Sequence, residues 1–346
     1  MKARYLKKTF VFKRPGGTSR GVLTKRDSWF IILSKDQQSG IGECAPLKGL
    51  SIDDHPDYEN KLKEVAENID QYAENLHTEL ENWPSIRFGL EMATRDLSGG
   101  GNRILFPGEF VEKGKGIPIN GLIWMGKKEF LLTQIKDLIS RGFRCLKMKI
   151  GAIEFEDEMN VLRLIRKEFP VKDMVLRVDA NGAFNENNAL EKLKKLSELN
   201  IHSIEQPVMA GQYELMADLC EKSPIPIALD EELIPVTNNG KRKKLLEEIQ
   251  PQYIILKPSL LGGFHSSKEW IDIADEQGIS WWITSALESN IGLNAISQWT
   301  YTLDHVNYQG LGTGSLFTNN IPSPLQIKGE KIFYFKAKPW ILDEFF

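Results

Sequence analysis

Two lysines flank a methionine in the stretch C-L-K-M-K-I at residues 145–150. In an extended strand alternate residues share a face, so Lys147 and Lys149 would lie on one face and the apolar residues on the other. If the apolar face packs against helices, both ammonium groups point into the interior, where a charged lysine is unfavourable without a partner. The sequence therefore predicts oppositely charged groups facing these two lysines.

Charged residues also end the next four strand-like runs, one strand–helix unit apart. They are Asp179, Glu205, Asp230 and Lys257, at successive intervals of 30, 26, 25 and 27 residues from Lys149. The carboxyl ends of barrel strands meet at one rim, so we expect three carboxylates to converge there, with lysines on opposite sides. Hard oxygen ligands in that number suit Mg²⁺, with Mn²⁺ as an alternative, and water or substrate in the remaining positions.

Each of these residues has a simpler reading when it is taken alone. The turn-like D-A-N-G contains Asp179, D-E-E at 230–232 could begin a helix, and Lys257 before a proline could lie in a surface loop. Lys147 and Lys149 could lie on a solvated antiparallel strand. The joint order of cation, three anions and cation on five successive strands favours a functional site.

The chemistry that suits such a site is removal of a proton α to a carboxylate. That carbon acid is too weak for a lysine unless the developing enediolate is stabilised, as a divalent cation on the carboxylate oxygens can do. The lysine must also be partly neutral near pH 7, which the metal and a second ammonium nearby favour. We expect Lys149, nearer the mouth, to be the base and Lys147 its helper, with Lys257 as the alternative base.

The elements that must position these residues form a repeated strand–helix unit from Ile117 onward. Seven helical stretches separate eight strands, which implies parallel pairing through right-handed crossovers and closure into a (β/α)₈ barrel of the α/β class. A doubly wound sheet usually has fewer strands and a glycine-rich phosphate turn after the first. The predicted strands are 117–122, 144–150, 174–179, 201–205, 225–230, 253–257, 279–285 and 306–311.

The first hundred residues differ from this repeat. Short strand-like runs with turns precede a charged helix from Tyr58 to about Leu76 and a second helix that opens with Pro84 and has an apolar stripe. The last 25 residues or so resemble a hairpin that returns to the N-terminal sheet. The sequence thus predicts an α+β capping domain from residues 1–110 and the C-terminal segment 320–346, with the barrel at 117–315.

Five motifs, in the order L-K-M-K-I, R-V-D-A-N-G, S-I-E-Q-P, A-L-D-E-E and I-L-K-P, resemble the muconate-lactonizing branch of the enolase superfamily. With G-I-G-E-C-A-P-L in the cap, the resemblance covers essentially the whole chain. It implies that Asp179, Glu205 and Asp230 are the metal ligands, and that Lys149 and Lys257 flank the substrate.

Within that branch, the stretches at 257–263, 284–293 and 310–314 resemble the o-succinylbenzoate synthase family of menaquinone biosynthesis. The resemblance implies dehydration of 2-succinyl-6-hydroxy-2,4-cyclohexadiene-1-carboxylate to 2-succinylbenzoate. Lys149 would take the α-proton and then protonate the leaving hydroxyl on the same face. Lys257 would hold its cation over the ring as aromaticity develops.

Further residues beside these motifs are candidate substrate contacts. The G-L-G-T-G stretch is typical of a turn, whose backbone amides could also hold a succinyl carboxylate. Ser285 is equally consistent with helix capping. The glycine- and serine-containing loops at 15–21 and 45–51 are expected to close over the site. The candidate substrate contacts are Asn181, Gly262, Ser285 and Gly312.

Other functions remain compatible with the same site. An N-succinylamino acid racemase or a dipeptide epimerase of this superfamily would use Lys149 and Lys257 as opposed bases. Dipeptide epimerases of this type carry Asp-x-Asp after the last barrel strand, where this chain has G-T-G-S-L-F-T-N-N, but the racemase is harder to exclude. A non-catalytic barrel that binds an acidic metabolite is disfavoured by the intact lysines and carboxylates.

Composition limits the partners. The 346 residues carry a formal net charge of −3, which disfavours nucleic acid, and no apolar run reaches transmembrane length. Three separated cysteines and the absence of a signal-peptide pattern at the start favour a reducing cytoplasm. We therefore expect a cytoplasmic enzyme with a small-molecule dicarboxylate substrate and neither nucleic acid nor membrane as partner; the sequence leaves a homo-oligomer open.

Overall fold

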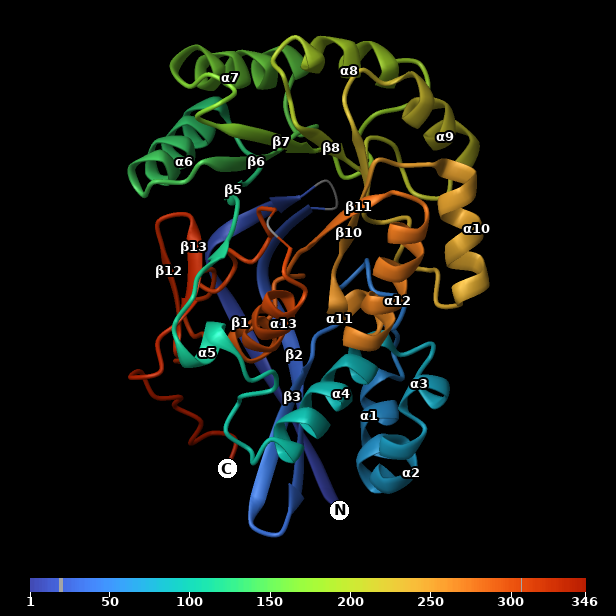
Figure 1. Ribbon diagram of the computed structural model, residues 1–346, viewed down its shortest axis with the longest axis vertical. Helices are drawn as coiled ribbons and strands as arrows, with labels where there is room; N and C mark the ends of the chain where they lie inside the picture. The colour runs from blue at the N-terminus through green and yellow to red at the C-terminus, as the bar shows by residue number, and fades with distance from the viewer. Residues whose placement is uncertain (19–20, 306) are drawn as a thin grey trace.

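The structure is a computed structural model that describes residues 1–18, 21–305 and 307–346. Its centre is a parallel sheet in the order β11-β10-β9-β8-β7-β6-β5 (Figure 1). These strands are β5 (Gly121–Ile123), β6 (Cys145–Lys149), β7 (Val175–Asp179), β8 (Ser203–Glu205), β9 (Ile227–Leu229), β10 (Tyr253–Leu256) and β11 (Ser280–Ile283).

Two single-residue bridges join the edges of this sheet. Gln309 bridges to Ile119 and Gly310 bridges to Thr284, both in parallel orientation. The predicted eighth strand at 306–311 is therefore reduced to these bridges; its first residue, Val306, lies outside the described residues. The predicted barrel is confirmed, with a short final strand that leaves the seam beside β5 only lightly hydrogen-bonded.

Helices connect the strands and cover the outside of the barrel. Figure 1 shows α6 to α10 in an arc around the parallel strands. In α6 the buried residues Leu131, Ile135 and Leu138 are spaced by four and three positions, so one face packs on the sheet. The helices are α6 (Lys128–Ser140), α7 (Phe155–Glu168), α8 (Ala189–Ser197), α9 (Tyr213–Lys222), α10 (Asn239–Ile249), α11 (Pro258–Leu261), α12 (Gly263–Glu276) and α13 (Asn290–Thr302).

The cap combines an antiparallel sheet with four helices. The strands are β1 (Lys2–Thr18), β2 (Gly21–Lys35) and β3 (Gln38–Cys44), in that order. The helices are α1 (Tyr58–Glu67), α2 (Ile69–Glu74), α3 (Leu76–Glu79) and α4 (Pro84–Ser98). The helix predicted from Tyr58 is interrupted at Asn68 and Asn75, whose side-chain amides donate to the carbonyls four residues earlier and compete with the helical ladder.

Helix α4 docks closely on β3 through glycines. A Cβ added to Gly42 would lie 1.8 Å from the carbonyl oxygen of Gly89, and one added to Gly89 would lie 2.3 Å from Cys44 Sγ. Pro84 occupies the first turn of α4, and the predicted apolar stripe is buried. This contact fixes the cap sheet against the helix that also touches α11 and α12 of the barrel.

The C-terminal hairpin differs from its prediction. Strand β12 (Leu325–Lys328) pairs with β13 (Lys331–Tyr334), and β13 pairs with β4 (Ile117–Pro118) and not with the N-terminal sheet, because Ile332 packs opposite Ile117 in the core. Residues 316–319 lie along β1, where Thr318 N–H donates to Val11 O at 2.9 Å. The end of the chain also returns to this sheet, where Glu344 pairs with Lys8 of β1 and Phe345 packs on Phe30 of β2. The short helix α5 (Glu109–Glu112) connects cap and barrel. The domain bounds proposed above stay a prediction.

No helix in the described part of the chain is both long and apolar enough to cross a membrane.

Candidate active site

Strand β6 directs its two lysines into the barrel, where carboxylates face them. Lys149 is the register partner of Asp179 on β7, and Asp179 is the register partner of Glu205 on β8. Lys147 Nζ donates to Asp179 Oδ2 at 2.9 Å and to Glu205 Oε2 at 2.7 Å. The alternation predicted for this strand therefore places both lysines against acidic partners, as expected for buried ammonium groups.

Lys149 is held by a carboxylate and an amide. Its Nζ donates to Asp179 Oδ2 at 2.8 Å and to Asn181 Oδ1 at 2.6 Å. Asn181 has φ of 43°, a left-handed conformation that Asn adopts more readily than most residues. Its side-chain amide donates to Glu231 Oε1 at 3.1 Å. Asn181 thus links the Lys149 side chain to the loop after β9.

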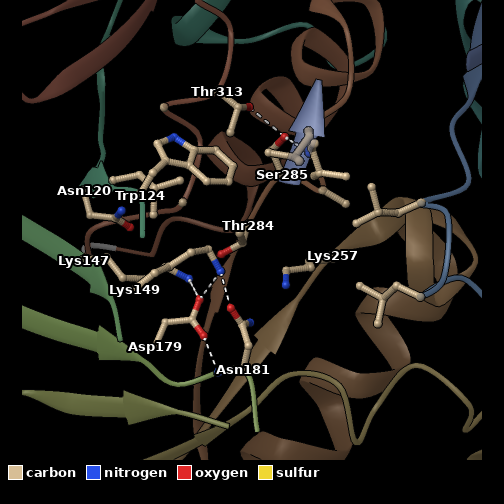
Figure 2. A pocket seen from close by; sticks show the side chains of 18 of the residues that line it. Asn120, Trp124, Lys147, Lys149, Asp179, Asn181, Lys257, Thr284, Ser285 and Thr313 are labelled. Carbon is tan, nitrogen blue, oxygen red and sulfur yellow. Dashed lines mark hydrogen bonds and ion pairs between the residues drawn. The ribbon is translucent and has the colours of Figure 1, made fainter. Parts of the chain in front are cut away.

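Lys257 approaches the same space from the opposite side. It follows β10 and precedes Pro258 at the start of α11. Its Nζ donates to Asp230 Oδ2 and lies 3.9 Å from Glu205 Oε1. Figure 2 shows Lys149 and Lys257 on opposite sides of the cavity, with Asp179 and Asn181 on the Lys149 side. The predicted opposition of the lysines is present in the structure.

Burial and charge act in opposite directions on the β6–β8 groups. Burial would raise the pKa of Asp179, but Lys147 and Lys149 hold that pKa well below its ordinary value. Burial would lower the pKa of Lys147, but Asp179 and Glu205 raise it above its ordinary value. These two groups are therefore a stable ion pair at neutral pH.

The pKa of Asp230 shifts in the opposite direction to that of Asp179. Burial raises its pKa well above the ordinary value, and Glu231 and Glu205 add to the rise, while the nearby Lys257 opposes it. Burial would lower the pKa of Lys257. The negative charges of Asp230, Glu205 and Glu231 outweigh this and raise the pKa of Lys257 above its ordinary value. Additional positive charge at this position would favour the ionised form of Asp230.

The donor set fits a hard divalent cation. Within the described ranges, no three Asp, Glu, His or Cys side chains surround one common point. The carboxylates are joined instead through lysines, since Lys147 bridges Asp179 and Glu205, and Lys257 contacts Asp230. Glu205 Oε1 is buried and has no hydrogen-bond partner. Three carboxylates at neighbouring strand ends, one of them with a buried oxygen that accepts no hydrogen bond, are ligands of the kind that Mg²⁺ uses.

A cavity of about 160 Å³ lies over these groups at the carboxyl ends of the strands. The cap completes its wall with residues 21–23, Leu47, Lys48 and Leu50. The predicted loop at 45–51 thus reaches the site, and the predicted loop at 15–21 reaches it through Gly21 among its described residues; Ser19 and Arg20 are outside the described residues. The barrel contributes the remainder: Asn120, Leu122, Trp124, Lys147, Lys149, Asp179, Asn181, Lys257, Thr284, Ser285, Ala286, Leu287, Gly310, Gly312 and Thr313.

The other predicted substrate contacts divide into two groups. Asn181, Ser285 and Gly312 line the cavity, and Ser285 Oγ also donates to Glu288. Gly262 is not among the lining residues. A Cβ added there would lie 3.4 Å from Arg87 Nη1 of α4, so the structure places Gly262 at the contact between cap and barrel.

Sequence reasoning missed a group of wall residues on the first barrel strand. Every second residue from just before the start of this strand to just past its end faces the cavity, namely Asn120, Leu122 and Trp124. Their period of two was visible in N-G-L-I-W, but none carries a charge that would have singled it out. Thr284 and Thr313, at the ends of the last two strands, were missed for the same reason.

Comparisons with known proteins give consistent results. The family model described as enolase C-terminal domain-like matches residues 131–333, and the model described as MenC, N-terminal domain, matches residues 18–97. An o-succinylbenzoate synthase from Desulfotalea psychrophila is 44% identical, over 95% of this chain and 98% of the relative. A hydrophobic dipeptide epimerase from Roseobacter litoralis is 24% identical, over 94% and 95%.

The crystal structure of MenC from Desulfotalea psychrophila superposes with a TM-score of 0.86 at 41% identity, covering 96% of this chain and 99% of that one. Both the cap and the barrel are thus shared along nearly the full length. The chain belongs to the o-succinylbenzoate synthase family of the enolase superfamily.

Proposed function

We propose that this protein is an o-succinylbenzoate synthase, a hydro-lyase that converts 2-succinyl-6-hydroxy-2,4-cyclohexadiene-1-carboxylate to 2-succinylbenzoate in menaquinone biosynthesis. The observation that carries the proposal is the near-full-length identity to an o-succinylbenzoate synthase, 44% over 95% of this chain. The pair Lys149 and Lys257, opposed across a cavity at the carboxyl ends of the barrel strands, supports it.

Mg²⁺, with Mn²⁺ as an alternative, would be held by Asp179, Glu205 and Asp230, as is general for enolase-superfamily sites. When bound, the cation supplies positive charge to the substrate carboxylate, on which negative charge develops as the α-proton leaves. Glu205 Oε1 has no hydrogen bond to give up, which makes it the carboxylate oxygen most readily available.

Lys149 is the acid–base group of this proposal. Its Nζ reaches the cavity wall and is oriented by Asn181 Oδ1. It takes the α-proton, holds it as an ammonium and returns it to the leaving hydroxyl on the same face, so one side chain serves both half-reactions. Lys147 gives both of its hydrogen bonds to carboxylates and balances their charge as the helper.

Lys257 acts from the other face. Its ammonium would lie over the ring as the ring becomes aromatic, a position in which a cation is attracted to the π-electrons. Ser285 and Gly312, on the side of the last two strands, are proposed to contact the succinyl part of this small-molecule dicarboxylate. Gly262 is not part of this contact set, because it packs against Arg87.

A second candidate is N-succinylamino acid racemization. It is favoured by one observation, the opposed lysines, which would remove and add a proton on opposite faces of one carbon. An N-succinyl-L-Arg/Lys racemase from Bacillus cereus is 24% identical over 66% of this chain. That likeness is much lower than the likeness to the synthase.

The two functions separate in one comparison. The purified protein with Mg²⁺ is given the cyclohexadiene carboxylate, followed by ultraviolet absorbance, and N-succinylamino acids in D₂O, followed by loss of the α-proton signal in NMR. We expect a kcat/KM for dehydration that clearly exceeds that for exchange. Exchange of N-succinylamino acids without dehydration would make the protein a racemase.

We also propose a cytoplasmic location. Cys44, Cys145 and Cys220 are buried and free, which is compatible with a reducing compartment. The expectations about nucleic acid, membrane and homo-oligomer remain predictions.

A further inference from the structure

Two cavities adjoin beside β5. The catalytic cavity measures about 160 Å³, and a second cavity of about 440 Å³ lies at the lightly bonded seam of the barrel, between residues 12–15 of the cap, α6 and residues 312–316. The two cavities share part of their walls. The residues that line both are Asn120, Leu122, Trp124, Gly312 and Thr313.

Trp124 is the largest of the shared residues, and its position is set by three elements. The backbone N–H of Trp124 donates to Gln134 Oε1 of α6 at 2.9 Å, and Gln134 Nε2 donates to the backbone carbonyl oxygen of Trp124 at 3.0 Å. From the cap, Gly16 lies against the indole, so that a Cβ added to Gly16 would be 3.0 Å from Cζ3. Figure 2 shows the ring beside Asn120 and facing Ser285 and Thr313.

The second cavity suits an apolar chain that ends in a carboxylate. Phe130, Phe143 and Leu316 supply apolar wall. Cationic groups outnumber anionic ones in the wall: Lys13, Arg14 and Arg141 line it together with one carboxylate, Asp137, which lies 3.3 Å from the Arg141 guanidinium. A carboxylate at the end of an extended arm would therefore meet guanidinium groups there.

We propose that Trp124 sets the upper limit on the length of the carboxylate-bearing arm of the substrate. The inference rests on the proposed function, because it assigns the arm to the succinyl group. The indole closes the catalytic cavity toward the second one, so an arm longer than succinyl meets the ring. When the ring is removed, the two cavities become continuous and the longer arm extends toward Arg14 and Arg141.

The test compares the binding of two probes, 2-succinylbenzoate and 2-adipoylbenzoate, whose arms differ by two methylenes. Calorimetry on the full-length, Mg²⁺-loaded protein gives both dissociation constants without turnover. In Trp124→Ala the preference for the succinyl probe should fall by about tenfold relative to the unmodified protein, as expected for two methylenes moved into apolar space. Trp124→Phe keeps an aromatic ring between the two cavities, so it should keep the preference for the succinyl probe.

Phe130→Ala is the matched control, because Phe130 lines only the second cavity. This substitution enlarges the second cavity but keeps the Trp124 ring between the two cavities, so the preference for the succinyl probe should not change. If circular dichroism shows that Trp124→Ala does not fold, Trp124→Leu takes its place. The preference for the succinyl probe should then fall in the same direction but by less.

The inference would be overturned if a folded Trp124→Ala or Trp124→Leu variant still bound 2-succinylbenzoate and kept the preference of the unmodified protein. That result would leave the proposed function intact. The same would follow if Phe130→Ala shifted the preference as strongly. If the unmodified protein bound neither probe, the proposed function would fail and this inference with it.

Discussion

The Lys149 side chain is the residue on which the proposed reaction depends most. We expect Lys149→Ala to lower kcat by about 10²- to 10⁴-fold, because a positioned acid–base group contributes an amount of that order. The variant should also lose exchange of the substrate α-proton with D₂O, measured by mass spectrometry of recovered substrate. The ion pair of Lys147 with Asp179 remains in this variant, so the fold should be retained.

Lys257→Ala is the companion variant for that experiment. It should lower turnover while some α-proton exchange persists, because the base is still present. Exchange that survives in Lys149→Ala and disappears in Lys257→Ala would assign the base to Lys257 instead.

Asn181 is expected to act through Lys149. Because Asn181 has a positive φ, Asn181→Gly removes the side chain without adding backbone strain. Loss of the 2.6 Å hydrogen bond to Lys149 should lower kcat by about tenfold, in line with hydrogen bonds to charged groups. The check is steady-state kinetics beside thermal unfolding. A kcat equal to that of the unmodified enzyme would show that Asn181 does not orient the base.

Among single residues, the charged ones at the strand ends could be singled out from the sequence because their spacing follows the strand–helix repeat. Lys149, Asp179 and Glu205 are direct register neighbours in the barrel. Trp124 could not be singled out, because its significance comes from a cap glycine and a helix glutamine that approach it only in the folded chain. The placement of Gly262 against Arg87 depends on cap docking in the same way.

Among the elements, the contact of α4 with β3 has no space for a side chain at Gly42. Gly42→Ala would place a methyl group 1.8 Å from the carbonyl oxygen of Gly89. We expect a loss of about 1 to 3 kcal/mol in the free energy of unfolding, the range for overpacking, measured by urea denaturation. Gly108→Ala is the control, since no atom lies within 4 Å of its added Cβ. Equal stabilities of the two variants would contradict the close packing.

Helix α7 carries a pH-sensitive carboxyl group. Glu158 Oε1 accepts hydrogen bonds from Gly151 N–H at 2.7 Å and Ala152 N–H at 3.3 Å, in the loop that follows Lys149. Burial raises the pKa of Glu158 from 4.5 to about 7, although these N–H groups act in the opposite direction. Between these two pH values the unfolded chain has already lost the proton that the folded protein still holds. The contribution of Glu158 to stability therefore falls as pH rises through this window.

Glu158→Gln removes this titration and keeps an oxygen for the N–H groups. The difference in unfolding free energy between the variant and the unmodified protein should grow by roughly 2 to 3 kcal/mol in favour of the variant as the pH rises from 4.5 to 8. Above pH 8 this difference should stay constant. Urea denaturation at a series of pH values is the measurement. A stability difference that does not change with pH would contradict a raised pKa.

The elements themselves were predicted best where a repeat determined them. Strands β6 to β11 lie within their predicted bounds, because each apolar run is bounded by a turn and a helix. The first predicted strand, 117–122, divides instead into β4, which pairs with β13 outside the barrel, and β5, which begins at Gly121. The break of the first cap helix at Asn68 and the pairing of β13 with β4 depend on side-chain capping and tertiary contacts that a periodicity does not record.

For the whole molecule, the cavity exists only where the cap and the barrel meet. Leu23 and Leu47 from the cap face Lys149 and Lys257 from the barrel across the same space. The sequence indicated that cap loops would cover the site, but which cap residues reach it follows from docking through α4 and the C-terminal tail. The proposed chemistry thus rests on barrel residues, while the walls that would limit the shape of the substrate come from both parts together.

The measurement that tests the central claim most directly is an ultraviolet assay of the purified protein with the cyclohexadiene carboxylate, first with Mg²⁺ and then with EDTA. We predict conversion to 2-succinylbenzoate with Mg²⁺, loss of conversion with EDTA, and recovery when Mg²⁺ is restored, because three carboxylates are proposed to hold the ion. Folded, Mg²⁺-loaded protein that forms no 2-succinylbenzoate would contradict the account.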